Sequence, residues 1–200
     1  LEVSKEIYAE RLDASISDIA MRELGEKIME VQDKIRLAAK KAGVFKIVEF
    51  PSGTMSPAML RRLIASYKAR GITFDLVVVD YADLMAPNIN MRDEIANSKQ
   101  IYTDLRAIAQ EEDLAMLTAT QTNREGAKAA TAKMEHVAED FNRIRIADLV
   151  ISINATEEEK ARGEARLYMA ASRNQQGDFA IRIQQDKERM QFIKKILGTE

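Results

Sequence analysis

Four consecutive hydrophobic residues, Leu76–Val79, run directly into an acidic residue, Asp80. A near-continuous hydrophobic run of strand length is typical of a parallel β-strand buried on both faces. The carboxyl end of such a strand opens onto the crevice where α/β sheets bind ligands. An aspartate at that point can hold the water shell of a magnesium ion that bridges nucleotide phosphates. Because an ordinary strand also often leaves its sheet through an aspartate, the pattern alone leaves both interpretations open.

The rest of the chain predicts helices and strands in alternation. Apolar residues recur at helical spacing in four segments, 5–24, 26–42, 58–70 and 91–112. A short fifth helix is expected at 138–146. Short apolar runs predict strands at 44–50, 74–80, 114–120 and 148–153, followed by three successive strands between 165 and 195. This order predicts a single α/β domain over residues 1–200. Its mostly parallel central sheet has helices on both faces and antiparallel strands at the C-terminal end.

Composition excludes several classes of site. The chain has no cysteine and one histidine, His136, which excludes disulfides, thiolate metal sites and sites built from several histidines. Its formal net charge of −2 gives no general attraction to nucleic acid, so any contact with DNA must come from local basic groups. Because no apolar run approaches the length of a membrane span, we expect no membrane partner and a cytoplasmic location.

Five segments, in this order along the chain, resemble the C-terminal RecA-like ATPase domain of DnaB-type hexameric replicative helicases. The segments are "LEVS" (1–4), "FDLVVVDYADLM" (74–85), "LAMLTATQTNREG" (114–126), "ADLVISI" (147–153) and "MAASRNQQG" (169–177). The resemblance implies a RecA-like fold and an ATP-dependent DNA helicase motor that uses ATP and Mg²⁺. It also implies a hexameric ring of identical subunits that moves on single-stranded DNA. A primase or a helicase loader is a further candidate partner, and a phage-derived member is expected.

The resemblance assigns a role to each matching residue. Glu2 corresponds to the glutamate that polarises the attacking water, and Asp80 to the aspartate of the magnesium shell. Gln121 corresponds to the polar residue that senses the γ-phosphate and relays its state to the DNA-binding loops. Arg173 corresponds to the arginine finger offered to the nucleotide of the neighbouring subunit. By residue type alone, Glu2 and Arg173 read as surface charges, and Gln121 equally well as an ordinary loop residue.

Basic residues in two polar segments are candidates for contact with DNA. Arg92 lies in the segment 86–93, while Arg124, Lys128 and Lys133 lie among small residues in the segment 122–136. Small residues let the backbone approach a phosphate chain, and the cations supply the salt-dependent part of the affinity. Since neither segment contains an aromatic residue, we expect no base stacking. A solvated loop is an equally good interpretation of each single cation.

The chain departs from the family pattern at three points. It contains no GxxxxGK[ST] motif, which in the family would lie just before Leu1, so we expect the domain to be incomplete at its N-terminus and to bind ATP weakly on its own. Ala171 stands where the family commonly has a lysine, and the segment after Gln121 lacks the family's glutamine- and serine-rich pattern. Two alternatives therefore stay open: a RecA- or KaiC-like recombination ATPase, and a non-catalytic interaction module with a degenerate ATPase fold.

Overall fold

The computed structural model describes residues 3–121, 145–173, 177 and 179–200. Its α-helices are α1 (Lys5–Ser17), α2 (Ile28–Ala39), α3 (Pro57–Lys68), α4 (Glu94–Glu111) and α7 (Glu157–Ala161). Two short 3-10 helices are η1 (Met21–Glu23) and η2 (Ala82–Leu84). The strands are β1 (Leu76–Val79), β2 (Ala115–Thr118), β3 (Leu149–Asn154), β4 (Glu164–Ser172), β5 (Ala180–Asp186) and β6 (Gln191–Thr199).

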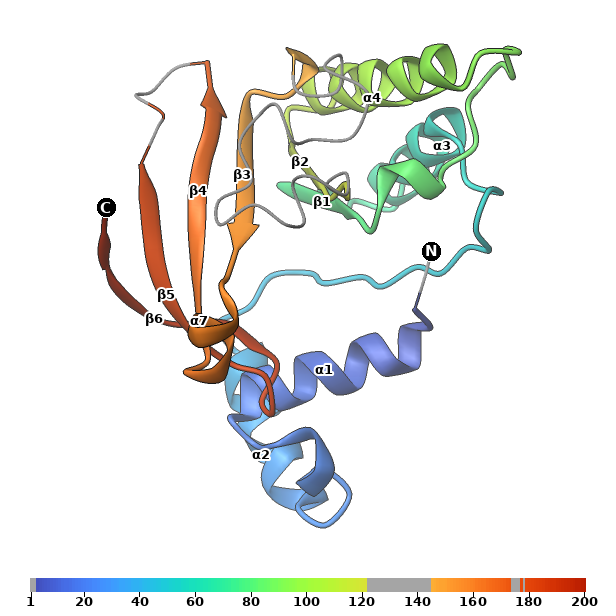
Figure 1. The fold of residues 1–200 in the computed structure, drawn as a ribbon. Coiled ribbons are helices and arrows are strands. Elements are labelled where there is room, and N and C mark those ends of the chain that lie inside the picture. The colour runs from blue at the N-terminus through green and yellow to red at the C-terminus, as the bar shows by residue number, and fades with distance from the viewer. Residues whose placement is uncertain (1–2, 122–144, 174–176, 178) are drawn as a thin grey trace.

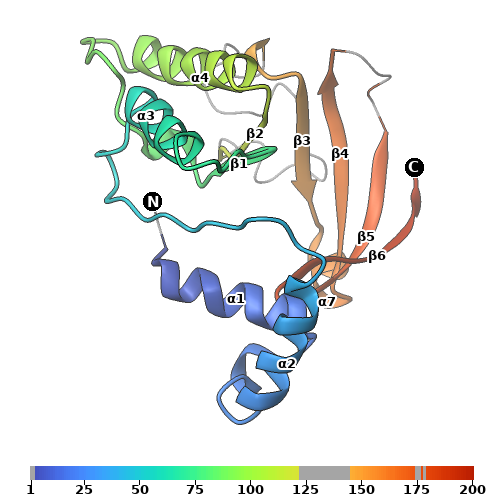
Figure 2. The ribbon, with the colours of Figure 1, turned by 180° about the vertical axis from the view of Figure 1, so that it is seen from behind.

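The strands form two sheets of different type. β1 and β2 pair in parallel, and β3, β4, β5 and β6 form an antiparallel sheet in that order. Helices α3 and α4 lie together beside the β1–β2 pair, whereas α1 and α2 lie on the other side of the extended segment that leads into α3 (Figures 1 and 2). The predicted α/β class with antiparallel strands at the C-terminal end is therefore confirmed.

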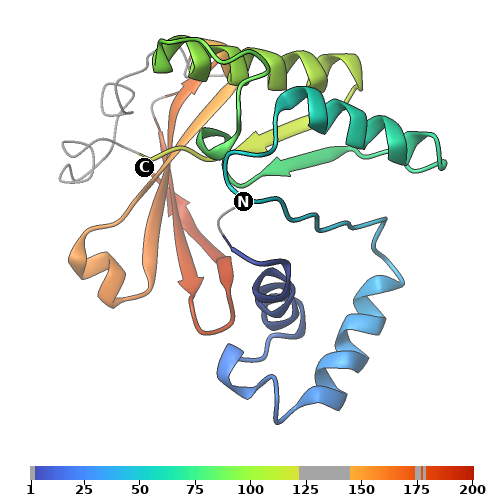
Figure 3. The ribbon, with the colours of Figure 1, turned by 90° about the vertical axis from the view of Figure 1, so that its right-hand side faces the viewer.

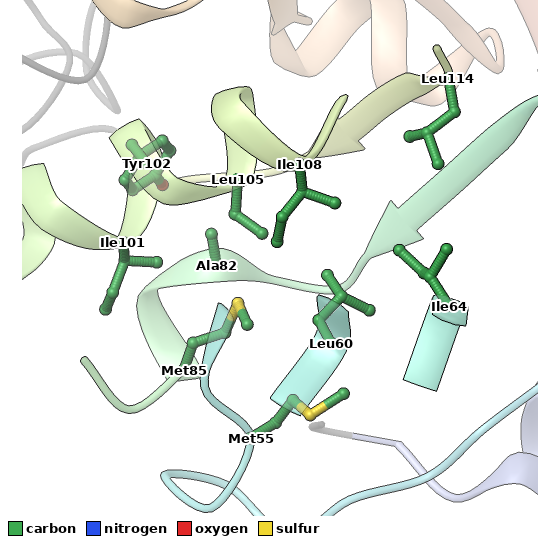
Figure 4. Packing of buried hydrophobic residues seen from close by; sticks show 10 residues of the cluster. All are labelled: Met55, Leu60, Ile64, Ala82, Met85, Ile101, Tyr102, Leu105, Ile108 and Leu114. Carbon is green, nitrogen blue, oxygen red and sulfur yellow. The ribbon is translucent and has the colours of Figure 1, made fainter. Parts of the chain in front are cut away.

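The main hydrophobic core lies between the β1–β2 pair and the two helices beside it. Leu60 and Ile64 of α3 meet Leu105 and Ile108 of α4, and Ile108 is fully buried (Figure 4). The spacing of three or four residues in each helix places these side chains on one face. Val77, Val79 and Met116 pack against the cluster from the strands. Packing against this core holds β1 and β2 in place, and so positions the residues that follow each strand.

The opposite face of β1 and β2 is exposed. Leu76, Val78 and Leu117 have exposed fractions of 52%, 57% and 56%. The hydrophobic run predicted burial on both faces, but α3 and α4 cover the same side of the pair. Within the described ranges, the alternate side chains of both strands therefore remain accessible to solvent or to another layer of protein.

Several predicted element boundaries were wrong. The segment 44–50 is extended but belongs to no strand, because no described segment pairs with it; Phe45 is 67% exposed. The first helix ends at Ser17, where Asp18 adopts a left-handed conformation with φ of 56°. The loop expected at 156–164 contains α7, which starts with a capping box between Thr156 and Glu159. Most of the helix predicted at 138–146 lies outside the described residues.

Candidate functional site

The carboxyl ends of β1 and β2 are joined by one hydroxyl group. The register pairs Val79 with Thr118. The Thr118 hydroxyl donates to the Val79 carbonyl at 2.9 Å and accepts the backbone N–H of Ala82 at 2.9 Å. Since Ala82 is fully buried, this pair of bonds fixes the turn that follows β1. Asp80 is the first residue of that turn, so its position depends on Thr118.

Asp80 lies at the carboxyl end of β1 and is half-buried. The phenol of Tyr8, on α1, donates a hydrogen bond of 2.6 Å to Asp80 Oδ2. Burial, and secondly the contact with Asp80, raises the pKa of Tyr8 to about 12. The phenol is therefore neutral near pH 7 and acts as a hydrogen-bond donor. Sequence reasoning did not find Tyr8, because the two residues are separated by 72 positions and no local pattern links them.

Gln121 lies at the same edge of the sheet as Asp80. It follows the end of β2, is exposed, and its side-chain amide donates to the Tyr81 hydroxyl at 3.4 Å. Because Tyr81 is the residue after Asp80, the structure brings the predicted magnesium-shell residue and the predicted phosphate sensor to adjacent strand ends. Figures 1 and 3 show β1 and β2 side by side. The parallel pairing of β1 and β2 accounts for this proximity, because it brings the carboxyl ends of both strands to one edge.

A second carboxylate in the turn, that of Asp83, is engaged by two neighbouring elements. Asp83 Oδ1 accepts from the Tyr102 hydroxyl of α4 at 3.0 Å, and Asp83 Oδ2 accepts from the Thr120 hydroxyl at 2.8 Å. These bonds tie the turn after β1 to the helix and to the residues after β2. Asp83 therefore supports the shape of the site, a role that the sequence analysis did not assign to it.

Arg173 lies away from this edge, at the end of β4. Its backbone N–H donates to the Asp148 carbonyl at 3.0 Å, and its Nε lies 3.7 Å from Asp148 Oδ1. Its guanidinium group also donates to the Arg145 carbonyl. Arg106 of α4 donates to the same Asp148 oxygen at 2.7 Å. Among the residues that the structure describes, no contact joins Arg173 to Asp80 or Gln121: Arg173 follows β4 of the antiparallel sheet, whereas Asp80 and Gln121 follow the strands of the parallel pair.

Arg92 is exposed in a segment whose shape is fixed by asparagines. Asn97 accepts the Met91 backbone N–H at 2.8 Å and donates to the Met91 carbonyl at 2.9 Å. Asn88 accepts the Ala58 backbone N–H at 2.8 Å, which ties the same segment to α3. The other predicted site residues, Glu2, Arg124, Lys128 and Lys133, lie outside the described residues, as does the one histidine, His136.

The described residues offer few acidic side chains to a magnesium ion at this edge of the sheet. Among the described residues, no three acidic or histidine side chains gather in a group that could enclose an ion. Magnesium does not require such a cage, because it keeps several waters and is commonly held through one or two carboxylates and substrate phosphates. Asp80, half-buried and fixed at one oxygen by Tyr8, suits that role. The donor set therefore fits a hydrated magnesium ion that is shared with a nucleotide.

Comparison with known proteins places the chain in a family. The family model of the DnaB-like helicase C terminal domain matches residues 1–194. The chain belongs to this family. The DnaB-like replicative helicase of Enterobacteria phage T4 is 21% identical to this chain over an alignment of 208 residues. The alignment covers 98% of this chain and 44% of the phage protein. The suspected family is thus confirmed, as is the relation to a phage helicase.

Solved structures share the fold of this DnaB-like domain. The structure of a DnaB-like replicative helicase and its interactions with primase matches with a TM-score of 0.79 and 16% identity, over 96% of this chain and 48% of that chain. A second solved structure, described as an ATPase domain, matches with a TM-score of 0.80 and 17% identity, over 97% of this chain and 72% of that one. The DnaB-like domain therefore spans about half the length of the phage T4 helicase and of the helicase solved with primase. No helix in the described part of the chain is long and apolar enough to cross a membrane.

Proposed function

We propose that this DnaB-like domain is part of the motor of a replicative DNA helicase, which couples hydrolysis of Mg-ATP at subunit interfaces to translocation on single-stranded DNA. The observation that carries the proposal is the placement of Asp80 and Gln121 at the ends of adjacent parallel strands, beside Tyr81, in a chain of this family. Adjacent parallel strand ends are where α/β proteins bind nucleotides.

Each predicted residue has a defined chemical task in this proposal. Asp80 holds the water shell of the magnesium ion, which, when bound, neutralises charge on the phosphates. Glu2 accepts a proton from the attacking water, and Gln121 responds to the γ-phosphate. Arg173 acts on the nucleotide of the neighbouring subunit; within one chain its contacts are with Asp148 and Arg145 and not with Asp80. An arginine finger of this kind is worth about 10³–10⁵ in rate.

The intact protein is proposed to form a hexameric ring. In this assembly, Arg92 and the cations Arg124, Lys128 and Lys133 face single-stranded DNA in the central channel. The bonds of Asn88 and Asn97 hold the segment that carries Arg92 in a fixed shape, which favours its use as a contact surface. A primase is a candidate partner, since one structurally similar helicase is described together with primase. A helicase loader is a second candidate.

The test of the motor function is hydrolysis stimulated by DNA, measured on the protein produced from its complete gene. We expect single-stranded DNA to raise the ATPase rate and the protein to unwind a forked duplex in the presence of ATP and Mg²⁺. Gln121→Ala should remove the stimulation by DNA, because the proposed link between phosphate and DNA is lost. A protein that hydrolyses ATP without response to DNA, and that does not unwind the fork, would contradict the proposal.

Contact with DNA is tested separately by charge removal. Replacing Arg124 and Lys128 with alanine should weaken binding of single-stranded DNA and lower the slope of log affinity against log salt by about 1.4, at about 0.7 for each lost phosphate contact. The matched control is Lys41→Ala, which removes an exposed cation from the end of α2. Unchanged affinity and salt slope in the double variant would show that these two residues do not bind DNA.

A second candidate function is a non-catalytic interaction module with the same fold. One observation favours it: apolar side chains of β1 and β2 are exposed on one face. Such a module would assemble with partners without hydrolysing ATP. Absence of Mg-dependent ATPase activity in the assembled protein from the complete gene would favour the module over the motor.

A further inference from the structure

Tyr8 reaches the candidate magnesium residue from a distant part of the chain. It lies near the start of α1, is half-buried, and donates to Asp80 Oδ2 at 2.6 Å. A distance of about 2.5–2.7 Å is typical of a hydroxyl that donates to an ionised carboxylate, which is among the stronger hydrogen bonds in proteins. The Tyr8 phenol is thus a strong donor to the Asp80 carboxylate.

The contact also ties α1 to the end of β1. Helix α1 is capped by Ser4, whose side chain accepts the Ile7 backbone N–H, so the helix begins just after Glu2 in the sequence. Near its other end, the Ser15 carbonyl accepts from Gln191 at 3.3 Å, which anchors α1 to the start of β6. Tyr8 therefore connects the segment that follows Glu2 with the edge of the sheet that carries Asp80.

We propose that Tyr8 is a positioning residue for the ATPase site: it fixes the orientation of the Asp80 carboxylate toward the magnesium shell and holds α1 at that edge. The inference rests on the proposed function of Asp80. A tyrosine suits the task because its rigid ring has few rotatable bonds and its hydroxyl is the only polar atom of the side chain. A hydrogen bond to a metal-site carboxylate limits its rotation, and loss of such an outer bond typically costs about 10–100-fold in metal affinity.

The first experiment tests the contact without any catalysis. Unfolding by urea is measured for the chain with Tyr8→Phe, with Asp80→Asn and with both changes. If the hydroxyl and the carboxylate interact, the double variant should lose less stability than the two single variants lose together. The difference should correspond to about 10-fold in the unfolding equilibrium constant. Additive effects would overturn the inference, because they would show that the two groups do not interact.

The second experiment tests the positioning role in the protein from the complete gene. Tyr8→Phe keeps the ring and removes only the hydroxyl, so it should raise the Mg²⁺ concentration needed for half-maximal ATPase activity by about 10-fold. The matched control is Tyr67→Phe on α3, whose ring packs edge-on against Phe74 with centroids 5.3 Å apart. The control should leave the Mg²⁺ requirement unchanged.

The outcomes separate this inference from the proposed function. An unchanged Mg²⁺ requirement in Tyr8→Phe, together with loss of activity in Asp80→Asn, would overturn the role of Tyr8 and leave the motor function in place. Wild-type activity in Asp80→Asn would overturn both. A raised Mg²⁺ requirement in Tyr8→Phe and non-additive stability would support the assignment of Tyr8.

Discussion

Replacement of Thr118 by valine should destabilise the edge of the sheet at which Asp80 lies. Valine keeps the shape of threonine and removes the hydroxyl, so the bonds to the Val79 carbonyl and from the Ala82 backbone N–H, both 2.9 Å, are lost. Each such hydrogen bond contributes about 1 kcal/mol, and a buried N–H left without a partner costs about 1–3 kcal/mol. Because Ala82 is fully buried, we expect a loss of about 2–3 kcal/mol in the free energy of unfolding.

The assay is urea unfolding followed by circular dichroism, together with a thermal melt. For a chain of this length, the expected loss corresponds to a decrease of about 4–12 °C in the melting temperature. Thr118→Ser keeps the hydroxyl and should stay close to the wild type, and Thr73→Val tests an exposed threonine just before β1. If Thr118→Val were as stable as the wild type, or Thr118→Ser as unstable as Thr118→Val, the role of the hydroxyl would be refuted.

Three further predictions concern acid stability, a surface ion pair and nucleotide binding. Hydrogen bonds from Lys194 and then from Arg189 lower the pKa of Asp186 to about 2, against an ordinary value of 3.8, so its contribution to stability is present above about pH 4 and lost as the pH falls toward 2. The melting temperatures of the wild type and Asp186→Asn should therefore differ at about pH 5 and converge toward pH 2; a constant difference would contradict this. Asp148→Asn should lower the free energy of unfolding, measured in urea, by less than about 1 kcal/mol, because this carboxylate is 61% exposed. A larger loss would show that its ion pairs with Arg106 and Arg173 act as a network. Calorimetry on the chain alone should detect weak or no ATP binding, and micromolar affinity would show that a phosphate-cradling loop is not required.

The sequence was informative where local chemistry decides the structure. A serine is typical of the residue before a helix, and the Ser56 side chain does accept the Met59 backbone N–H at the start of α3, in the segment predicted to be helical from residue 58. Asp80 and Gln121 were predicted at strand ends, and both lie at the edge where β1 and β2 end. In each case, the governing rule concerns a few neighbouring residues or the fixed direction of parallel strands.

The sequence was uninformative where distant segments decide the structure. Residues 44–50 have the composition of a strand, yet a strand also needs a partner, and the described chain supplies none for this segment. The bond between Tyr8 and Asp80 and the sharing of Asp148 by two arginines depend on how α1, α4 and β4 are placed in space. No periodicity or motif encodes such pairings, so only the structure could reveal them.

The measurement that tests the central claim most directly is Mg-dependent ATP hydrolysis by the protein from the complete gene, with Asp80→Asn compared with Asp75→Asn. The two aspartates flank the same strand, Asp80 at its carboxyl end and Asp75 at its amino end. If Asp80 holds the magnesium shell, Asp80→Asn should reduce the rate by at least about 100-fold, as loss of one main electrostatic group does in other enzymes, and Asp75→Asn should retain the wild-type rate. Equal activity of the two variants and the wild type would contradict the claim that the acidic end of β1 is the catalytic edge of this domain.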